Sequence, residues 1–459
     1  MVPGVYCRMD TITQEDGITL FQEKRHAEAA EAFRQLLAQP LSAGLEADTR
    51  RRLADTLVSL GQAEEAAAER ELAGNIAEAS TGDPMALMTK GDLLKRDHRY
   101  DEACSAYEQA LRLMWTLSPA TEPSRAYLMA KLALAHYEAS RPAKTVIWAG
   151  ASLANSPNPT IRFIMHRMCG VGYSTLGDLE KAEAHYIQAL KLARAGGKPS
   201  EIAQGLTTLG TVQRKRGAFE AAIATARLAT ETFGHPGRGG QLLEAECLRD
   251  VGQFEEARAV VAAMKEGPRW DRPDVEQRTQ VICSLTLAWI EANDDRPDAA
   301  LAALREAWAG LNVSRKAYPL PSPPAEGEDK LVLYCDATAV RIYAQLGQAE
   351  NASRMQESVE SRLPRFDQDR ASMLAVYSEL APAAFALGDL SQSETWWRKY
   401  LACEPDVIGL TKAYYGLGQV FLRQGEATAA HKAFAQSVAP GVDSLYARRA
   451  QARLDELGG

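Results

Sequence analysis

Features that define several common protein classes are scarce in this chain of 459 residues. Its 7 cysteines are scattered and form no Cys-x-x-Cys pair, which argues against a disulfide framework and favours a reducing compartment. No stretch approaches the roughly 18 consecutive apolar residues that a membrane-spanning helix needs, and Met1 to Asp10 lacks the apolar segment of a signal peptide. The sequence therefore predicts a cytoplasmic protein that neither spans nor binds a membrane.

An excess of positive charge is also missing. Lys and Arg number 52 against 60 Asp and Glu, which gives a net charge of −8, and the two signs are interleaved along the chain. The one compact basic run, Arg214-Lys215-Arg216, is short compared with the basic surfaces that bind nucleic acids. We therefore expect no nucleic-acid partner.

Motifs of nucleotide binding and of nucleophilic catalysis are absent as well. The chain contains no Gly-x-x-x-x-Gly-Lys-[Ser/Thr], no Gly-x-Ser-x-Gly and no Gly-x-Gly-x-x-Gly after a predicted strand. His166 and Cys169 share one predicted helical face, but no second pair follows at ligand spacing, so we interpret both as packing residues. The sequence predicts no enzyme, no cofactor and no metal site.

The chain has instead a small residue that recurs at a nearly regular interval. Thr145 and Ser393 take this position in two degenerate copies, and alanine takes it in the others. Successive copies are 35 to 52 residues apart, which is typical of a repeat array in which each unit packs on its neighbours. The alanine copies are Ala29, Ala66, Ala103, Ala182, Ala222, Ala257, Ala300, Ala352 and Ala430.

Each copy has the pattern of two helices joined by a tight turn. In the copy over 162–193, apolar residues recur at helical spacing, Leu176-Gly177-Asp178 interrupts them, and the helical spacing then resumes. Gly177 can adopt the left-handed conformation that ends a helix, and Asp178 can cap the next one. The sequence therefore predicts an all-α solenoid, closed by a capping helix over 444–457.

Two further positions accompany the central small residue, although the second of them is weakened to Arg70, Ala149, Ala226 and Gln356 in four copies. A first small position lies twelve residues before it, as Gly91 does before Ala103, and a large position lies four residues after it, as Tyr107 does. We expect the small residues to let the paired helices approach closely, and the large residue to fill the gap that follows. A bulky side chain at the central position is therefore expected to overpack the pair.

The combination of glycine, alanine and aromatic residue in Gly91, Ala103 and Tyr107, and again in Gly170, Ala182 and Tyr186, resembles the tetratricopeptide repeat family. The resemblance covers about residues 10–440. It implies about eleven repeats, some degenerate, in a right-handed superhelix whose concave groove binds proteins or peptides.

Four prolines at Pro319, Pro321, Pro323 and Pro324 predict an exposed, proline-rich loop over 313–330. We expect this loop to separate an N-terminal array over 1–312, with about eight repeats, from a C-terminal array over 331–459. The second array has about three repeats and the capping helix.

The resemblance also implies which side chains face the concave groove. Apolar and aromatic residues dominate this set and arginines accompany them, which suits a peptide with apolar anchors and a few acidic groups. Packing against the following repeat is the alternative role for any single member. The set comprises Tyr127, Leu134, Tyr137, Ile164, Arg167, Thr211, Arg214, Ile282, Leu285, Trp289, Tyr334, Arg341, Phe385, Lys412, Tyr415 and Arg423.

We therefore predict a non-enzymatic interaction scaffold that binds a protein or peptide segment. The carboxylate clamp known in this family is not expected, because the matching positions, from Ile18 to Gln419, contain no asparagine. A ligand-responsive regulator or peptide sensor that acts through a separate effector is the alternative, and self-association stays open. A hidden enzyme would be recognised by a pocket with two or more titratable groups of shifted pKa.

Overall fold

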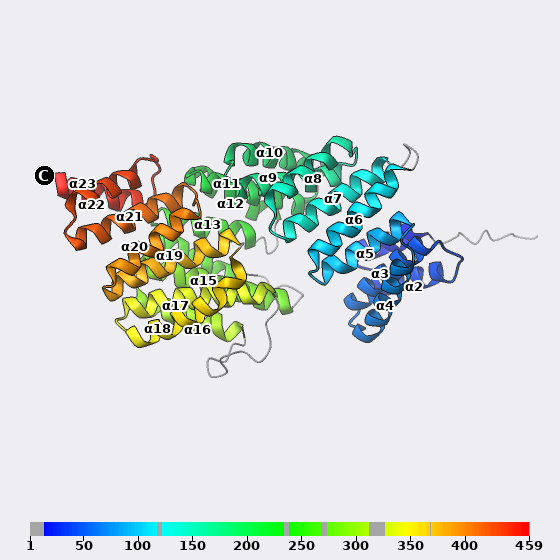
Figure 1. Cartoon of the computed structure of the whole chain (residues 1–459), viewed down its shortest axis with the longest axis horizontal. Helices are drawn as coiled ribbons and strands as arrows, with labels where there is room; N and C mark the ends of the chain where they lie inside the picture. The colour runs from blue at the N-terminus through cyan, green and yellow to red at the C-terminus, as the bar shows by residue number, and fades with distance from the viewer. Residues whose placement is uncertain are drawn as a thin grey trace, which may run out of the picture. The chain divides into compact units, whose positions relative to one another are not determined.

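The computed structural model describes residues 13–116, 122–233, 238–267, 273–311, 326–367 and 369–458. Within these ranges the chain contains helices and no strand, and consecutive helices form helix–turn–helix repeats (Figure 1). Eleven pairs, from α1/α2 to α21/α22, precede the last helix, α23. None of these helices has the length and apolar composition needed to cross a membrane.

The helices of the first six pairs are α1 (Gln14–Gln22), α2 (His26–Leu37), α3 (Ala43–Ser59), α4 (Ala63–Ala79), α5 (Pro84–Arg96), α6 (Tyr100–Trp115), α7 (Glu122–Glu138), α8 (Pro142–Asn155), α9 (Pro159–Thr175), α10 (Leu179–Gly196), α11 (Pro199–Lys215) and α12 (Phe219–Phe233). Those that follow are α13 (Arg238–Asp250), α14 (Phe254–Glu266), α15 (Pro273–Asn293), α16 (Pro297–Gly310), α17 (Glu326–Gln345), α18 (Ala349–Arg362), the short 3-10 helix η2 (Leu363–Phe366), α19 (Arg370–Leu387), α20 (Leu390–Ala402), α21 (Val407–Gln424), α22 (Ala427–Val438) and α23 (Leu445–Gly458).

The predicted repeat register is confirmed. All eleven central small residues are buried, with exposed fractions of 0 or 1%. The first small position lies against the large one: a Cβ added to Gly91 would be 2.4 Å from the Tyr107 ring, and one added to Gly418 would be 2.4 Å from the Phe434 ring. Glycine is required there because the aromatic ring occupies the space of a side chain on the partner helix.

The turn predicted after α9 also forms as expected. Gly177 has a φ of 86°, in the left-handed region that favours glycine. The Asp178 carboxylate accepts a hydrogen bond from the Lys181 amide at 3.1 Å and caps α10.

The chain divides into two compact units, unit 1 over residues 1–172 and unit 2 over residues 173–459. The sequence predicted a division at the proline-rich segment instead. Helices on both sides of that segment share one buried core, to which Leu304 of α16 and Leu333 of α17 both belong. A connecting segment does not interrupt the stack when the repeats that flank it bury each other's apolar faces.

The predicted loop is also shorter than expected. Residues 326–330 form the first turn of α17, whereas residues 312–325 lie outside the described residues.

Within unit 2, the end of the array returns to an earlier part of it. Ile408 of α21 shares a buried cluster with Phe219 of α12 and Cys247 of α13. The Arg448 side chain of α23 donates to the Val251 carbonyl, next to the end of α13. In Figure 1, α21 accordingly lies beside α11 to α13. The repeats from α11 to α23 thus form a closed turn.

Candidate functional site

A cavity of about 700 Å³ lies inside unit 2. Its walls come from α11, α13 and α15 and from α19, α21 and α23, with contributions from residues 174–179 and from the end of α20. These are mainly the first helices of their repeats, which the closed turn brings around a common space. The volume falls in the range of natural ligand sites, about 300–1,000 Å³.

Three residues of the predicted groove line this cavity: Arg214, Trp289 and Lys412. The Trp289 indole Nε1 donates to Thr338 Oγ1 at 2.8 Å, and its ring lies 5.9 Å from the Arg249 guanidinium carbon. Trp289 therefore packs against the following repeat and still borders the cavity.

Two other predicted groove residues lie in the interior instead. Leu285 is 2% exposed and Arg341 is 6% exposed. Arg341 donates to the Ala292 carbonyl at 2.9 Å and forms an ion pair with Glu379 at 3.4 Å. Neither side chain is available to a ligand, because the next helix of the array covers positions that would face a groove in a more open superhelix.

The remaining predicted residues of unit 2 lie outside the cavity lining. The Tyr334 hydroxyl is 3.0 Å from Ser372 Oγ. The Arg423 guanidinium lies 5.1 Å from the centre of the Phe385 ring. Thr211, Ile282 and Tyr415 are partly buried.

Five predicted residues belong to unit 1. Tyr127 and Tyr137 are the most open of them, at 40 and 44% exposed. Leu134, Ile164 and Arg167 are partly buried.

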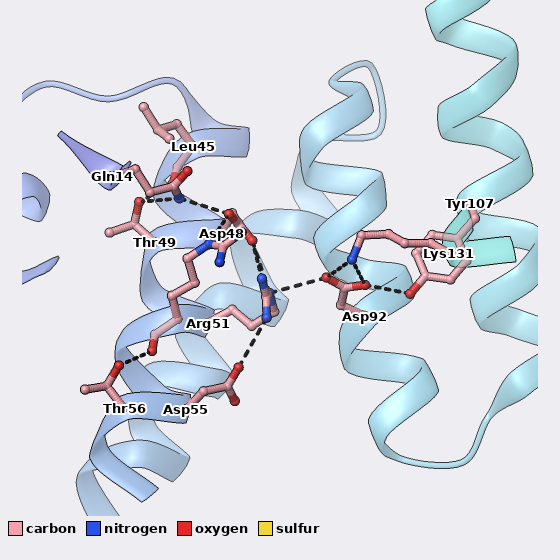
Figure 2. Close-up of polar contacts among 11 residues, drawn as sticks. Gln14, Leu45, Asp48, Thr49, Arg51, Asp55, Thr56, Asp92, Tyr107 and Lys131 are labelled. Atoms are coloured by element: carbon pink, nitrogen blue, oxygen red, sulfur yellow. Dashed lines mark hydrogen bonds and ion pairs between the residues drawn. The ribbon is translucent and has the colours of Figure 1, made fainter. Parts of the chain in front are cut away.

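Unit 1 also contains a chain of polar contacts that joins its first four repeats (Figure 2). Gln14 of α1 donates to Asp48 of α3, and Arg51 of α3 contacts both Asp48 at 2.6 Å and Asp92 of α5 at 3.5 Å. Lys131 of α7 completes the chain with an ion pair to Asp92 at 2.7 Å. Each charge in this chain has an opposite charge beside it.

The cavity of unit 2 has a charge cluster that is similarly satisfied. Arg214 pairs with Asp250 at 2.8 Å and with Glu246 at 3.3 Å, and Arg249 pairs with Asp250 at 2.8 Å. Burial opposes ionisation of Asp250, but the two guanidinium groups outweigh it and lower the pKa of this carboxyl. Burial likewise opposes the charge on Arg214, but Asp250 and Glu246 raise its pKa.

Lys215 differs from Arg214 and Arg249 in this respect. Its ammonium donates to Ser174 Oγ at 2.9 Å, and no carboxylate of the described residues lies within 4.0 Å of it. Burial lowers the pKa of Lys215; the Asp406 carboxylate partly opposes this, whereas Arg214 and Arg370 lower it further.

Sequence reasoning missed Lys215, Arg249, Arg370 and Tyr446 as cavity residues. Lys215 directly follows the predicted groove residue Arg214, so the basic run Arg214-Lys215-Arg216 was the sequence feature that could have indicated it. Arg370 and Tyr446 come from repeats far along the chain, and only the closed turn brings them to this space. No local pattern could have found them.

The shifted pKa values make this cavity the place to look for a hidden enzyme. The shifts hold Asp250, Arg214 and Arg249 in their charged forms, and only Lys215 moves toward neutrality. Lys215 and Ser174 have the composition of a serine–lysine dyad. Ser174, however, lies in the last turn of α9, where backbone carbonyls converge, and this end of a helix favours cations over an oxyanion.

The described residues contain neither an activated cysteine–histidine pair nor a metal site. In unit 1, Cys104 Sγ lies 3.7 Å from His136 Nδ1, but both are buried. Burial raises the pKa of the thiol and lowers the pKa of the imidazole to about 4, so neither group is activated for nucleophilic attack. Among the described residues, no group of three or more His, Cys, Asp or Glu is placed to hold a metal ion.

Comparisons with known proteins agree with this architecture. The sequence profile of the tetratricopeptide repeat family matches residues 172–195. No curated protein sequence matches the chain. The matched segment lies within one of the eleven helix pairs, so the resemblance to the tetratricopeptide repeat family and the predicted α-solenoid fold are both confirmed.

Solved structures are similar to this chain at low sequence identity, and one of them has a TM-score above 0.5. A Rap protein complexed with competence and sporulation factor has a TM-score of 0.52 and 12% identity, over 82% of this chain and 99% of that chain. Aspartyl phosphate phosphatase F from Bacillus subtilis has a TM-score of 0.44 and 12% identity, over 89% and 97%. Yeast Tom70 has a TM-score of 0.38 and 13% identity, over 97% and 94%.

Proposed function

We propose that this protein is a non-enzymatic interaction scaffold and that the cavity of unit 2 binds a peptide or an extended protein segment. The observation that carries this proposal is the cavity of about 700 Å³ that is lined mainly by the first helices of repeats in unit 2. A space of this size suits a short peptide segment, which could contact side chains from several repeats at once.

The composition of the walls supports a peptide ligand. Trp289, Tyr400 and Tyr446 supply aromatic surface, and charged groups of both signs lie between them. Aromatic anchors beside polar groups are the combination that gives most of the affinity in protein recognition. The solved structure of a Rap protein complexed with competence and sporulation factor supports the proposal by analogy of fold alone.

We further propose a cytoplasmic location and a protein or peptide partner, with neither nucleic acid nor membrane as a ligand. The six described cysteines are free, and all except Cys403 are buried, which suits a reducing compartment.

The alternative function is a ligand-responsive regulator whose output comes from a separate effector. It is favoured by one contact: Tyr446 and Asn293, which close the turn through a hydrogen bond, both line the cavity. A ligand that touches both would stabilise the closed state. A peptide-dependent decrease in the radius of gyration, measured by solution scattering, would favour this alternative over a passive scaffold.

The direct test is selection of peptides from a random displayed library against the full chain, followed by calorimetry with synthetic copies. We expect Trp289→Ala to weaken binding by roughly tenfold or more. Tyr137→Ala, which removes an exposed tyrosine of unit 1, is the matched control and should bind normally. The cavity assignment is wrong if Tyr137→Ala weakens binding and Trp289→Ala does not.

A further inference from the structure

We infer that the cavity of unit 2 binds its peptide through a carboxylate held at Lys215, so that the ligands are acidic peptides. This inference rests on the proposed function and adds the chemistry that selects the ligand. It concerns a position different from the clamp positions that the sequence already excluded.

The geometry around Lys215 leaves hydrogen-bonding capacity open to a ligand. An ammonium has three N–H donors. Among the described residues, Lys215 makes one hydrogen bond, to the neutral hydroxyl of Ser174 at 2.9 Å. Lys215 and Ser174 both line the cavity. A carboxylate that enters the cavity can therefore accept from Lys215 without displacing a protein counter-ion.

The neighbouring Arg370 adds a second positive charge, and no carboxylate of the described part of the chain pairs with it. Its guanidinium donates to backbone carbonyls: Thr175 at 2.7 Å, Cys403 at 2.7 Å, and Glu404. These bonds fix the guanidinium in place and leave its charge uncancelled. Arg214 differs, because its charge is matched by Asp250 and Glu246.

Three features of the protein offset this positive charge only in part: the carbonyl end of α9, the Asp406 carboxylate and the Glu246 carboxylate, which is paired with Arg214. The carbonyl end of α9 carries roughly half an elementary negative charge, which is less than the combined positive charge of Lys215 and Arg370. Asp406 caps α21 by accepting from the Gly409 amide at 2.9 Å, which holds its carboxylate beyond ion-pair distance of Lys215. The Glu404 side chain is exposed. An anionic ligand group would complete the charge balance.

A carboxylate is the anion that this arrangement suits best. Lys215 presents a single ammonium with two open donors, whereas phosphate recognition usually uses a planar guanidinium fork or several backbone amides. The aromatic walls at Trp289 and Tyr446 suit an apolar residue close to the acidic one. The carboxylate can belong to an Asp or Glu side chain or to the C-terminus of the peptide.

The test uses the full chain and one synthetic decapeptide taken from the displayed library. The peptide is made in three forms: unchanged, with its Asp and Glu replaced by Asn and Gln, and with an amidated C-terminus. Each is titrated against the unaltered protein, Lys215→Met, Lys215→Arg and the control Lys432→Met, which removes an exposed lysine of α22.

We expect one of the two neutralised peptides to bind the unaltered protein roughly tenfold or more weakly than the unchanged peptide. The form that loses affinity identifies which carboxylate is used. That difference should disappear in Lys215→Met, return at least in part in Lys215→Arg, and persist in Lys432→Met. A loss that depends on both partners reports a direct interaction rather than a change of folding.

Other outcomes separate the two proposals. If peptides bind the cavity but neither neutralisation changes their affinity, the carboxylate inference fails and the proposed function stands. The inference also fails if Lys215→Met weakens charged and neutralised peptides equally, or if phosphorylated peptides depend on Lys215 and carboxylate peptides do not. If no peptide binds at all, the proposed function fails and the inference with it.

Discussion

The Tyr446 hydroxyl donates a hydrogen bond to Asn293 Oδ1 at 2.9 Å, and this contact joins residues 153 positions apart in the chain. Tyr446 lies on α23 and Asn293 at the end of α15. Asn293 Oδ1 also accepts from Arg341 at 3.1 Å, and its amide donates to the Trp289 carbonyl at 2.8 Å. The closed turn of unit 2 is therefore tied to its internal polar network.

Removing this hydroxyl should loosen the closure. We expect Tyr446→Phe to lower the free energy of unfolding of unit 2 by about 1 kcal/mol, the typical value of one hydrogen bond. Hydrogen exchange of the α23 amides should become faster. The control is Tyr414→Phe on α21, because no hydrogen bond of the Tyr414 hydroxyl is found among the described residues. Equal effects of both substitutions would show that the hydrogen bond between Tyr446 and Asn293 makes no specific contribution to the stability of unit 2.

A methyl group should have opposite effects at two glycines of unit 1. The Cβ of Gly91→Ala would lie 2.4 Å from the Tyr107 ring, so we expect a loss of about 1–3 kcal/mol through overpacking. Gly150, within α8, has no atom within 4 Å of such a Cβ. Gly150→Ala should therefore stabilise unit 1 by about 0.5–1 kcal/mol, because alanine favours helix. Chemical denaturation of both variants measures the two signs, and a neutral Gly91→Ala would contradict the register.

The polar chain of unit 1 should depend strongly on Asp92. Its carboxylate accepts hydrogen bonds from the Lys131 ammonium at 2.7 Å and from the Tyr107 hydroxyl at 2.6 Å. These side chains are largely shielded from water. We expect Asp92→Asn to cost about 2–4 kcal/mol, because it leaves a partly buried ammonium without its counter-ion.

The matched control joins the same two helices through a more exposed ion pair. Lys95 of α5 and Glu138 of α7 lie 2.8 Å apart, with 26 and 36% of their side chains exposed. Glu138→Gln should cost no more than about 1 kcal/mol, because water and salt screen such pairs. Equal losses for the two substitutions, in denaturant titrations of both variants, would argue against a special role for Asp92.

Unit 1 should also lose stability in acid through His136. Burial, followed by Lys144 and Arg141, lowers the pKa of this imidazole from 6.5 to about 4, and Asp101 opposes the shift. The unfolded chain therefore binds a proton that the folded chain excludes, so stability falls as the pH drops from about 6.5 toward 4. The full loss is roughly 3 kcal/mol.

Denaturation at pH 7 and at pH 4.5 measures this effect. His136→Gln should show a smaller loss between the two pH values than the unaltered protein. The control His98→Asn, at an exposed position, should keep the original loss. If His136→Gln retains the full pH dependence, other groups are responsible for it.

The comparison of prediction and structure has a consistent pattern. The central small residues, the turn at Gly177 and the capping helix depend on contacts within one repeat or with the next one, and all three were predictable. Leu285 and Arg341 were predicted to face a groove and are buried, because helices from neighbouring repeats cover them. Lys215 and Arg370 were missed, because their common surroundings require helices that are distant in the chain.

By itself, the sequence determined the helices, the turns between them and the order in which the repeats stack. The reason is that the spacing of small and large residues determines how each helix packs against its neighbours. Only the tertiary structure decided that α21 and α23 return to α11 and α13, which encloses a cavity and brings Lys215 close to Arg370. The reason is geometric. Small rotations between successive repeats add up over many helices, and the total rotation cannot be read from the sequence of any single repeat.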